Sequence, residues 1–115
     1  TADANRNALE NGVRNCQFIC GDIREKLGGI GFKPDLMIID PPRAGMHKDV
    51  LAETMALGPQ RIIYVSCNPT TLARDLETMV EDYELNEIQP VDMFPHTFHI
   101  EAVAKLSLRK KTSTD

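Results

Sequence analysis

The fold is decided by residues 61–69, which read RIIYVSCNP. The first six of these residues are mostly apolar, which is typical of a strand that is buried on both faces of a parallel sheet. Asn68 is a favourable helix N-cap, and Pro69 suits the first position of a helix. The stretch therefore predicts a buried strand that runs through Cys67 directly into a helix. The apolar stripe predicted for that helix consists of Leu72, Leu76, Met79, Val80 and Tyr83.

A second strand and helix of the same kind precede this stretch. Residues 35–39 contain the apolar run LMII, which also predicts a strand buried on both faces and ends at Asp40-Pro41-Pro42. Residues 47–57 are predicted to be helical, with Gly58 and Pro59 as the stop. The side chains expected to face the core from this helix are Val50, Leu51, Met55 and Ala52.

The rest of the chain continues the alternation of helices and strands. We predict helices over 2–11 and 23–27, a strand over 17–20, and an antiparallel pair of strands over 84–93 and 100–108. Such alternation indicates an α/β fold with a mostly parallel sheet. Ligands of these folds bind at the carboxyl ends of the strands, where the most distinctive sequences of this chain also fall.

Composition and charge restrict the classes of function. The chain has 115 residues, of which 42% are apolar and 26% charged, and no apolar run is long enough for a membrane span. We therefore expect a soluble cytoplasmic protein. The net charge of −4 argues against a dedicated nucleic-acid-binding module, but it leaves room for an enzyme that acts on RNA beside a basic neighbouring domain. Residues 109–115 are expected to form a polar tail.

The cysteines do not predict a disulfide framework. Cys16 and Cys20 lie four residues apart in an apolar stretch, and we interpret them as buried small hydrophobic residues. Cys67 differs because it follows a buried strand and precedes a helix N-terminus, which favours a thiolate. That arrangement recurs in covalent catalysis, although a buried structural cysteine would have the same position.

The sequence after the strand at 35–39 offers a second candidate. In Asp40-Pro41-Pro42-Arg43, two prolines fix an extended turn and remove two hydrogen-bond donors, so that carbonyl groups and a carboxylate are left to face a ligand. The Arg43 guanidinium suits a phosphate or a carboxylate. Taken alone, the motif is better explained as a rigid turn that ends a strand; the other candidates at neighbouring strand ends favour the functional interpretation.

A third candidate is the stretch from Phe94 to Glu101. His99 and Glu101 share one face of a strand that begins near residue 99, and Glu101 would suit a general base beside a cysteine. His96, His99 and Glu101 are also a weak candidate for a metal site. The plainer interpretation is that all three are surface residues of the strand and its loop.

Together, these residues resemble the family of RNA uracil-C5 methyltransferases, which form 5-methyluridine in ribosomal and transfer RNA. The matching blocks are Asp-Pro-Pro-Arg at 40–43, Ser-Cys-Asn-Pro at 66–69 and Phe-Pro-His-Thr-Phe-His-Ile-Glu at 94–101. The resemblance extends to about residue 108. It implies that residues 1–108 are the C-terminal part of a Rossmann-like methyltransferase domain dependent on S-adenosylmethionine, which acts on rRNA or tRNA and needs no metal.

The resemblance also implies roles for individual residues. Cys67 would be the nucleophile that adds to carbon 6 of uracil, and Glu101 would remove the carbon-5 proton. Asp40, Pro41 and Arg43 would form the pocket for the target base, with Asp40 also near the cofactor. Asp22 would correspond to the acid that contacts the adenine of the cofactor in this class of methyltransferases. The target base must leave its stack to be reached.

The chain departs from the family pattern at its N-terminal side. It has no initial strand with a Gly-rich turn for the methionine end of the cofactor, and no strand with the acid that usually holds the ribose. We therefore expect a partial domain, inactive by itself, whose exposed sheet edge and apolar surface favour self-association. The alternatives are a methyltransferase for cytosine carbon 5 or an exocyclic nitrogen, or a non-catalytic α/β binding module, in which Cys67 would be buried and far from Glu101.

Overall fold

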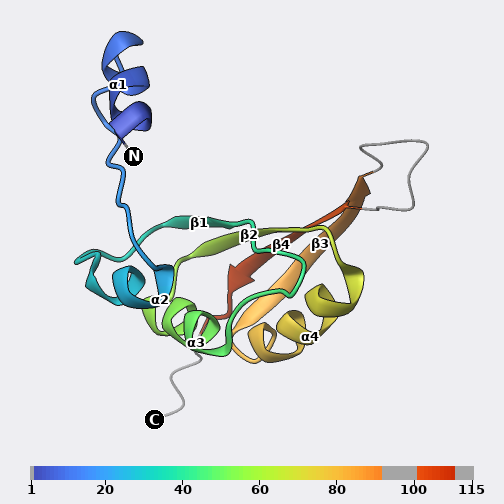
Figure 1. Cartoon of the computed structure of the whole chain (residues 1–115). Helices are drawn as coiled ribbons and strands as arrows, with labels where there is room; N and C mark the ends of the chain where they lie inside the picture. Colours follow the sequence, from blue (N-terminus) through green and yellow to red (C-terminus); the bar gives the residue numbers. More distant parts are fainter. Residues whose placement is uncertain (1, 92–100, 111–115) are drawn as a thin grey trace. The chain divides into compact units, whose positions relative to one another are not determined.

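The computed structural model describes residues 2–91 and 101–110. A four-stranded sheet organises the larger of its two units, residues 31–115. The strands are β1 (Leu36–Ile39), β2 (Arg61–Ser66), β3 (Tyr83–Val91) and β4 (Glu101–Leu108). Their order in the sheet is β1-β2-β4-β3, with β1 parallel to β2 and β4 antiparallel to both of its neighbours (Figure 1). The α/β fold and the C-terminal antiparallel pair predicted from the sequence are confirmed. The prediction of a mostly parallel sheet is wrong for the described strands, because β4 lies antiparallel between β2 and β3 and only β1 and β2 pair in parallel.

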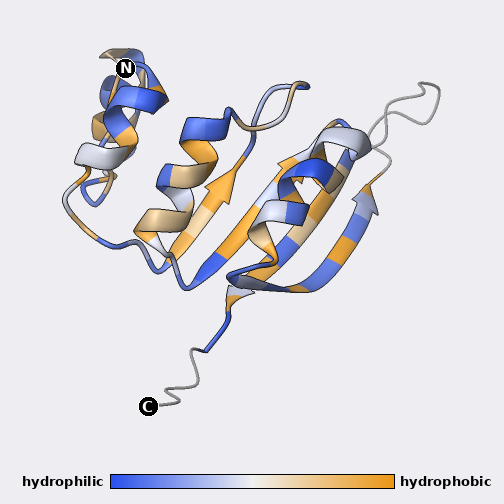
Figure 2. Ribbon diagram, turned by 90° about the horizontal axis from the view of Figure 1, so that it is seen from below, coloured by the Kyte–Doolittle hydropathy of each residue, from blue (hydrophilic) through white to orange (hydrophobic). Residues whose placement is uncertain are grey.

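Two helices cover one face of this sheet. Helix α3 (Lys48–Leu57) connects β1 to β2, and α4 (Pro69–Met79) connects β2 to β3. Both helices lie on the same side of the sheet, and both stand in front of it when the molecule is seen from below (Figures 1 and 2). Side chains that point from β2 and β4 toward the helices are buried, as the pairs Ile62–Leu106 and Tyr64–Ala104 show.

The opposite face of the sheet carries no helix in the described part of this unit. The exposed fraction of Ile38 is 66% and that of Leu36 is 48%, while Ile63 and Val65 are half-buried. The prediction that β1 and β2 are buried on both faces is therefore wrong for these residues. The physical reason is that an apolar run fixes a strand's propensity but not the layer that covers it, and α3 and α4 cover the same face.

Capping residues define the helix ends much as the sequence indicates. The Asn68 side chain accepts a hydrogen bond from the Thr70 N–H over 3.0 Å, and Pro69 begins α4. Gly58 ends α3 in the left-handed conformation at φ 60°, as its position after the helix predicted. At the start of α3, His47 Nδ1 accepts a hydrogen bond from the Asp49 N–H over 3.1 Å.

The helix faces differ from the prediction at three positions. Ala52 is exposed rather than directed at the core, and Thr54 is buried in its place, with its hydroxyl donating to Val50 O over 2.8 Å. Bonding to the helix backbone satisfies that hydroxyl, so a polar residue can occupy the buried face. Tyr83 is buried, but it belongs to β3 rather than to the stripe of α4.

Residues 1–30 form the smaller unit, described here by itself. It contains α1 (Ala2–Glu10), α2 (Ile23–Lys26) and a short 3-10 turn, η1 (Leu27–Gly29). The strand predicted over 17–20 is absent, because a strand needs hydrogen bonds to a neighbour and no described strand pairs with these residues. Cys16 and Cys20 are consequently exposed, which corrects the prediction that they are buried.

At the C-terminal side, Arg109 is tied back to the sheet unit. Its N–H donates to Asp82 O over 2.9 Å, and its Nε donates to Val80 O over 3.1 Å. Residues 111–115 lie outside the described part of the chain, so a polar tail over 109–115 stays a prediction. Among the described residues, no helix is long and apolar enough to cross a membrane.

Candidate active site

The pairing of β2 with β4 brings Cys67 and Glu101 to one end of the sheet. Ser66 pairs with Ala102 in the antiparallel register, Cys67 follows Ser66, and Glu101 precedes Ala102. Cys67 and Glu101 therefore both lie next to the Ser66–Ala102 pair, although they are 34 places apart in sequence (101 − 67). Both side chains are half-buried, so each is sheltered yet within reach of a ligand.

Asp40 lies at the same end of the sheet. In the parallel pairing of β1 with β2, Ile39 is opposite Tyr64, and Asp40 is the next residue after the strand. It is exposed, Pro41 beside it is half-buried, and no hydrogen bond or ion pair of Asp40 is found among the described residues. The carboxyl ends of β1 and β2 thus bring together Asp40 and Cys67, as expected for a ligand site in an α/β sheet.

Ser66 and Asn68 fix the backbone on both sides of Cys67. The Ser66 hydroxyl donates to Asn68 O over 2.9 Å and accepts from the Asn68 N–H over 3.0 Å. The Asn68 side chain in turn caps α4. Cys67 is thus held between a buried strand end and a capped helix start, so that its backbone position is well defined.

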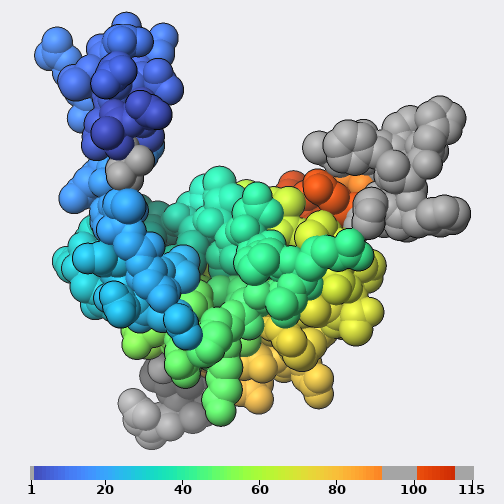
Figure 3. Space-filling model, in the orientation of Figure 1, coloured from blue at the N-terminus to red at the C-terminus, as the bar shows by residue number. Residues whose placement is uncertain are grey.

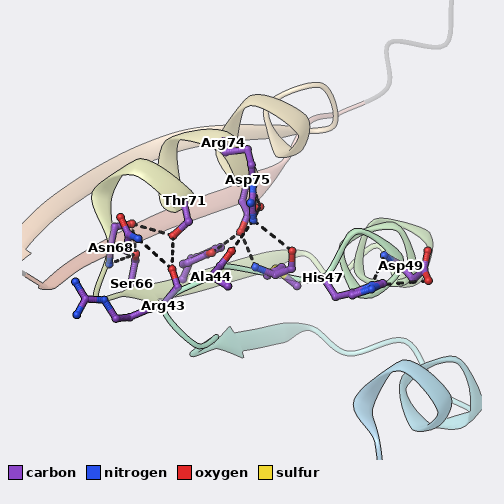
Figure 4. Close-up of polar contacts among 11 residues, drawn as sticks. Arg43, Ala44, His47, Asp49, Ser66, Asn68, Thr71, Arg74 and Asp75 are labelled. Atoms are coloured by element: carbon purple, nitrogen blue, oxygen red, sulfur yellow. Dashed lines mark hydrogen bonds and ion pairs between the residues drawn. The ribbon is translucent and has the colours of Figure 1, made fainter.

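The backbone of residues 43–46 lies against the first turns of α4 (Figure 4). Arg43 O accepts hydrogen bonds from Asn68 Nδ2 and Thr71 Oγ1, each over 3.1 Å. Ala44 O accepts a hydrogen bond from Arg74 Nη2 over 2.9 Å. In the space-filling view, the green of the chain that follows β1 lies beside the yellow of α4 (Figure 3). We call this row of contacts between residues 43–46 and α4 the seam.

Asp75 completes the seam from inside. Its side chain is only 2% exposed, and Oδ2 accepts hydrogen bonds from the Met46 N–H over 2.9 Å and from the Tyr64 hydroxyl over 2.5 Å. Arg74 donates to Oδ1 over 3.2 Å, which balances the buried charge. Burial, followed by the hydrogen bond to Asp75 and its negative charge, raises the pKa of Tyr64 well above its ordinary value, so Tyr64 stays a donor at neutral pH.

Gly45 is required by the seam. Its φ of 82° lies in the left-handed region that favours glycine. A Cβ at this position would lie 2.6 Å from Arg74 Nη2 and 3.0 Å from both Asp75 Oδ2 and Thr71 Cβ. Only a residue without a side chain therefore allows the backbone to approach α4 this closely.

The Arg43 side chain points away from the seam, as Figure 4 shows. The carbonyl oxygen of Arg43 is fixed by α4, whereas its exposed guanidinium has no ion-pair partner in the residues that the structure describes. The backbone is thus anchored and the charge is free for a ligand.

The remaining sequence-predicted residues lie outside the described part of the sheet unit. Asp22 belongs to residues 1–30, where its carboxylate caps α2 by accepting from the Arg24 N–H over 2.9 Å and pairs with the Arg24 guanidinium over 3.0 Å. Its contact with a cofactor stays a prediction. His96 and His99 lie outside the described residues. Within the described ranges, no group of three His, Cys, Asp or Glu side chains could hold a metal ion.

Sequence analysis missed the residues of α4 that make the seam, namely Thr71, Arg74 and Asp75, and also Tyr64 of β2, which binds Asp75. One signal for them was present. Asp75 lies between Leu72 and Leu76 on the stripe of α4 that faces the core, and charged residues are rarely buried unless they are paired. An acid within an apolar stripe thus indicated a buried partner, though not which one.

The fold is a mixed α/β sheet with candidate residues at the carboxyl ends of β1 and β2. Comparisons with known proteins show the class to which the chain belongs. The sequence profile of the tRNA (Uracil-5-)-methyltransferase family matches residues 7–110. The chain belongs to this family.

Individual relatives are named as RNA methyltransferases. The chain is 48% identical over 111 residues to an uncharacterized RNA methyltransferase of Bacteroides thetaiotaomicron, covering 93% of this chain and 24% of that protein. It is 47% identical over 106 residues to another from Caldanaerobacter subterraneus, covering 89% of this chain and 24% of that protein. The chain thus spans about a quarter of the length of these relatives.

Two solved structures share the fold. The tRNA (uracil-54, C5)-methyltransferase of Pyrococcus abyssi, in complex with S-adenosyl-L-homocysteine, superposes with a TM-score of 0.76 at 44% identity, over 90% of this chain and 25% of that one. An rRNA methylase of Streptococcus thermophilus superposes with a TM-score of 0.69 at 9% identity, over 95% of this chain and 67% of that one, and it supports the fold alone.

Proposed function

We propose that this chain carries the chemical residues of an enzyme that methylates carbon 5 of a uridine in RNA. The observation that supports this most is the pairing of Ser66 with Ala102, which sets Cys67 and Glu101 side by side at one end of the sheet. A binding module would leave Cys67 buried and Glu101 distant, whereas Cys67 is half-buried and Glu101 is its neighbour across the strands.

Uracil carbon 5 is a weak nucleophile, so it must be activated before it is methylated. In the proposed reaction the Cys67 thiolate forms a bond to carbon 6, and the electron pair of the 5,6 double bond moves toward carbon 5 and the neighbouring carbonyl. Carbon 5 then attacks an electrophilic methyl group, and the bond from that methyl group to the sulfonium sulfur of the donor breaks, so that the donor leaves as a neutral thioether. This step needs a thiolate held in a fixed position, which the Ser66–Asn68 contacts supply.

Glu101 completes the reaction as a general base. Its carboxylate takes the proton from carbon 5, the electron pair of that C–H bond restores the 5,6 double bond, and the bond from carbon 6 to the Cys67 sulfur breaks. The thiolate is regenerated, and Glu101 keeps one proton to pass to solvent. Its half-buried position suits a base that must reach both substrate and water.

The methyl donor proposed is S-adenosylmethionine, which supplies a methyl group on a positively charged sulfonium. The Asp40 carboxylate fits such a group, because it is exposed at the carboxyl end of β1. It would favour the positive charge of the donor or accept a hydrogen bond from the target base. Asp22 is proposed to contact the adenine of the donor. No metal is needed for any of these roles.

Arg43 is proposed to bind a phosphate of the RNA beside the target uridine, with Pro41 shaping the pocket. Its guanidinium is exposed and directed away from the seam, and its backbone is anchored (Figure 4). A guanidinium matches the two oxygens of a phosphate group in a bidentate arrangement. The RNA is proposed to be rRNA or tRNA, with the uridine turned out of its stack.

Covalent trapping tests the proposed function. A full-length methyltransferase that carries these residues is incubated with S-adenosylmethionine and RNA that contains 5-fluorouridine, whose fluorine cannot leave as a proton does. We expect a stable protein–RNA adduct that disappears in Cys67→Ala and persists in Cys16→Ala, which removes an exposed cysteine outside the sheet unit. Absence of an adduct on RNA that is bound would favour methylation of a nitrogen or a non-catalytic role.

The 115-residue chain by itself is proposed to be inactive and to self-associate. Its sheet face opposite α3 and α4 bears the exposed Ile38, and β1 is an edge strand in the described sheet. We expect sedimentation velocity to show oligomers of this chain, and Ile38→Thr to reduce them. A chain that stays monomeric at all concentrations would contradict the proposed self-association. Methylation by the isolated chain would contradict the proposed inactivity.

A further inference from the structure

The seam joins two parts of the candidate site that are far apart in sequence. Residues 43–46 follow Asp40, and α4 follows Cys67. Contacts across the seam link residues 25 to 30 places apart, from Asn68 with Arg43 to Arg74 with Ala44. Because the proposed chemistry uses Asp40, Arg43 and Cys67 together, the distance between these groups depends on the seam.

Asp75 is the most deeply buried polar residue of the seam. It accepts hydrogen bonds from three sources: the backbone of Met46, the hydroxyl of Tyr64 in β2, and the guanidinium of Arg74. Its carboxylate therefore joins the segment after β1, strand β2 and helix α4 at one point. Such a buried carboxylate is stable only while its donors stay in place, so the network fixes a single arrangement of the three elements.

No step of the proposed chemistry uses Asp75. It is 2% exposed, and its oxygens are occupied by these donors, so it does not touch a substrate. An apolar residue would fill the same space on the stripe of α4 without the cost of burying a charge. The position of Asp75 therefore calls for a role that an apolar side chain would not fill.

We propose that Asp75, together with Tyr64, is a positioning residue that holds residues 43–46 on α4 and so sets Asp40 and Arg43 relative to Cys67. This inference rests on the proposed function for its catalytic consequence. Misplacement of reacting groups by about 1 Å costs on the order of 100-fold in rate. Loss of the network should therefore slow the chemical step more than it weakens binding of the methyl donor.

Two substitutions remove parts of the network with little change of shape, and a third serves as their control. Asp75→Asn removes the charge, and Tyr64→Phe removes one donor while Met46 and Arg74 still bind Asp75. Tyr83→Phe is the matched control. Tyr83 is as buried as Tyr64, and its hydroxyl also makes a short hydrogen bond, to Pro59 O over 2.6 Å, at the opposite end of β2.

The variants are compared in a full-length methyltransferase that carries these residues. We expect Asp75→Asn to lower kcat for 5-methyluridine formation by about 10- to 100-fold, and Tyr64→Phe by a smaller factor, with KM for S-adenosylmethionine within about twofold of the parent. Tyr83→Phe should leave both constants within about twofold. A kcat of Asp75→Asn and Tyr64→Phe equal to that of Tyr83→Phe would overturn the inference, as would an equal effect on kcat and on donor binding.

Hydrogen exchange gives a readout that does not depend on activity. The Met46 N–H is bound by Asp75, so its exchange should become at least about tenfold faster in Asp75→Asn, while it stays unchanged in Tyr83→Phe. If the parent protein forms no 5-methyluridine, the proposed function fails, and the exchange of Met46 still decides the positioning role. Unchanged exchange at Met46 in Asp75→Asn would overturn that role.

Discussion

The hydroxyl of Ser66 makes two hydrogen bonds to the backbone of Asn68, donating to its carbonyl over 2.9 Å and accepting from its N–H over 3.0 Å. These contacts close a tight turn with Cys67 at its middle. Strand β2 and helix α4 are thereby joined by a short connection, Cys67 and Asn68, that is closed by hydrogen bonds. The geometry of the candidate nucleophile is thus set by its two neighbours in sequence.

We expect Ser66→Ala to slow the formation of the covalent adduct with 5-fluorouridine RNA about tenfold, because the turn around Cys67 loses both contacts between the Ser66 hydroxyl and the Asn68 backbone. The free energy of unfolding should fall by only about 1 kcal/mol, the usual net worth of such hydrogen bonds. Adduct formation is followed by gel shift over time. The control is Ser107→Ala at the far end of the β2–β4 pair, and an equal rate in both variants would contradict the prediction.

Glu101→Gln should separate the two halves of the proposed reaction. An amide cannot take the carbon-5 proton, so we expect the adduct with ordinary uridine RNA to accumulate while release of 5-methyluridine falls by a factor on the order of 10² to 10⁴. Glu84→Gln, an exposed glutamate of β3, provides the control. If Glu101→Gln releases product at the parental rate and no adduct accumulates, the role of Glu101 is wrong.

Gly45→Ala should impair the site more than an equally strained substitution elsewhere. Gly45 and Gly58 both have positive φ, at 82° and 60°, so an alanine costs about 1 kcal/mol of backbone strain at each. Only at Gly45 does the new Cβ meet Arg74, at 2.6 Å, whereas at Gly58 the nearest atom is 3.7 Å away. Product formation measured at equal amounts of folded protein should therefore fall in Gly45→Ala and stay near the parental value in Gly58→Ala.

Arg43→Ala should weaken RNA binding in a salt-dependent way. If Arg43 contacts one phosphate, its loss lowers the slope of log affinity against log salt concentration by about 1. The measurement is RNA binding by fluorescence anisotropy at several salt concentrations. Arg61→Ala is a matched control, because Arg61 is exposed at the opposite end of β2. An unchanged slope in Arg43→Ala would exclude the phosphate contact.

The stability of the protein should fall at alkaline pH because of its buried tyrosines. Burial, with a smaller effect of the Asp82 charge, raises the pKa of Tyr83 to about 12. A tyrosine in the unfolded chain loses its proton near pH 10, and the folded Tyr83 loses it near pH 12. The stability that Tyr83 contributes in this way is therefore fully present below pH 10 and is lost as the pH rises from 10 to 12.

The contribution is on the order of 3 kcal/mol, since the pKa rises by about two units and each unit is worth about 1.4 kcal/mol. Urea unfolding at pH 9 and at pH 11 checks the sign. Tyr83→Phe should be less stable at pH 9, having lost the hydrogen bond to Pro59 O, but its stability should decline less with rising pH. A decline as steep as in the parent protein would contradict the assignment to Tyr83.

Sequence patterns predicted the elements that carry the site but not every part of their surroundings. Strands β1 and β2 have compact apolar runs, and α4 has its cap at Asn68, so local signals were sufficient for them. The strand predicted over 17–20 was wrong because pairing, not propensity, makes a strand. The prediction that both faces of the sheet are buried was wrong, because burial depends on where the helices pack. The apolar side chain of Ile38 does not determine that.

The candidate site divides in the same way. Cys67, Asp40 and Glu101 could be named as candidates because strand ends and short motifs mark them in the sequence, and the register brings Cys67 and Glu101 together. Their roles stay a prediction. The seam was missed because its contacts join side chains to backbone groups 25 to 30 residues away, which leaves no periodic pattern. Only the acid at position 75, within an apolar stripe, gave an indication.

The spacing along α4 also restricts how this protein can change in evolution. Asn68, Thr71 and Asp75 meet residues 43–46 from one face of the helix, so one inserted residue between Asn68 and Asp75 would rotate the later contacts by about 100°. Surface loops usually tolerate insertions. In residues 43–46, however, three carbonyl oxygens and the Met46 N–H are hydrogen-bonded to side chains of α4 and its cap, so an inserted residue would break some of these bonds. We therefore expect homologous sequences to keep the number of residues in both segments constant, even where the side chains around them vary.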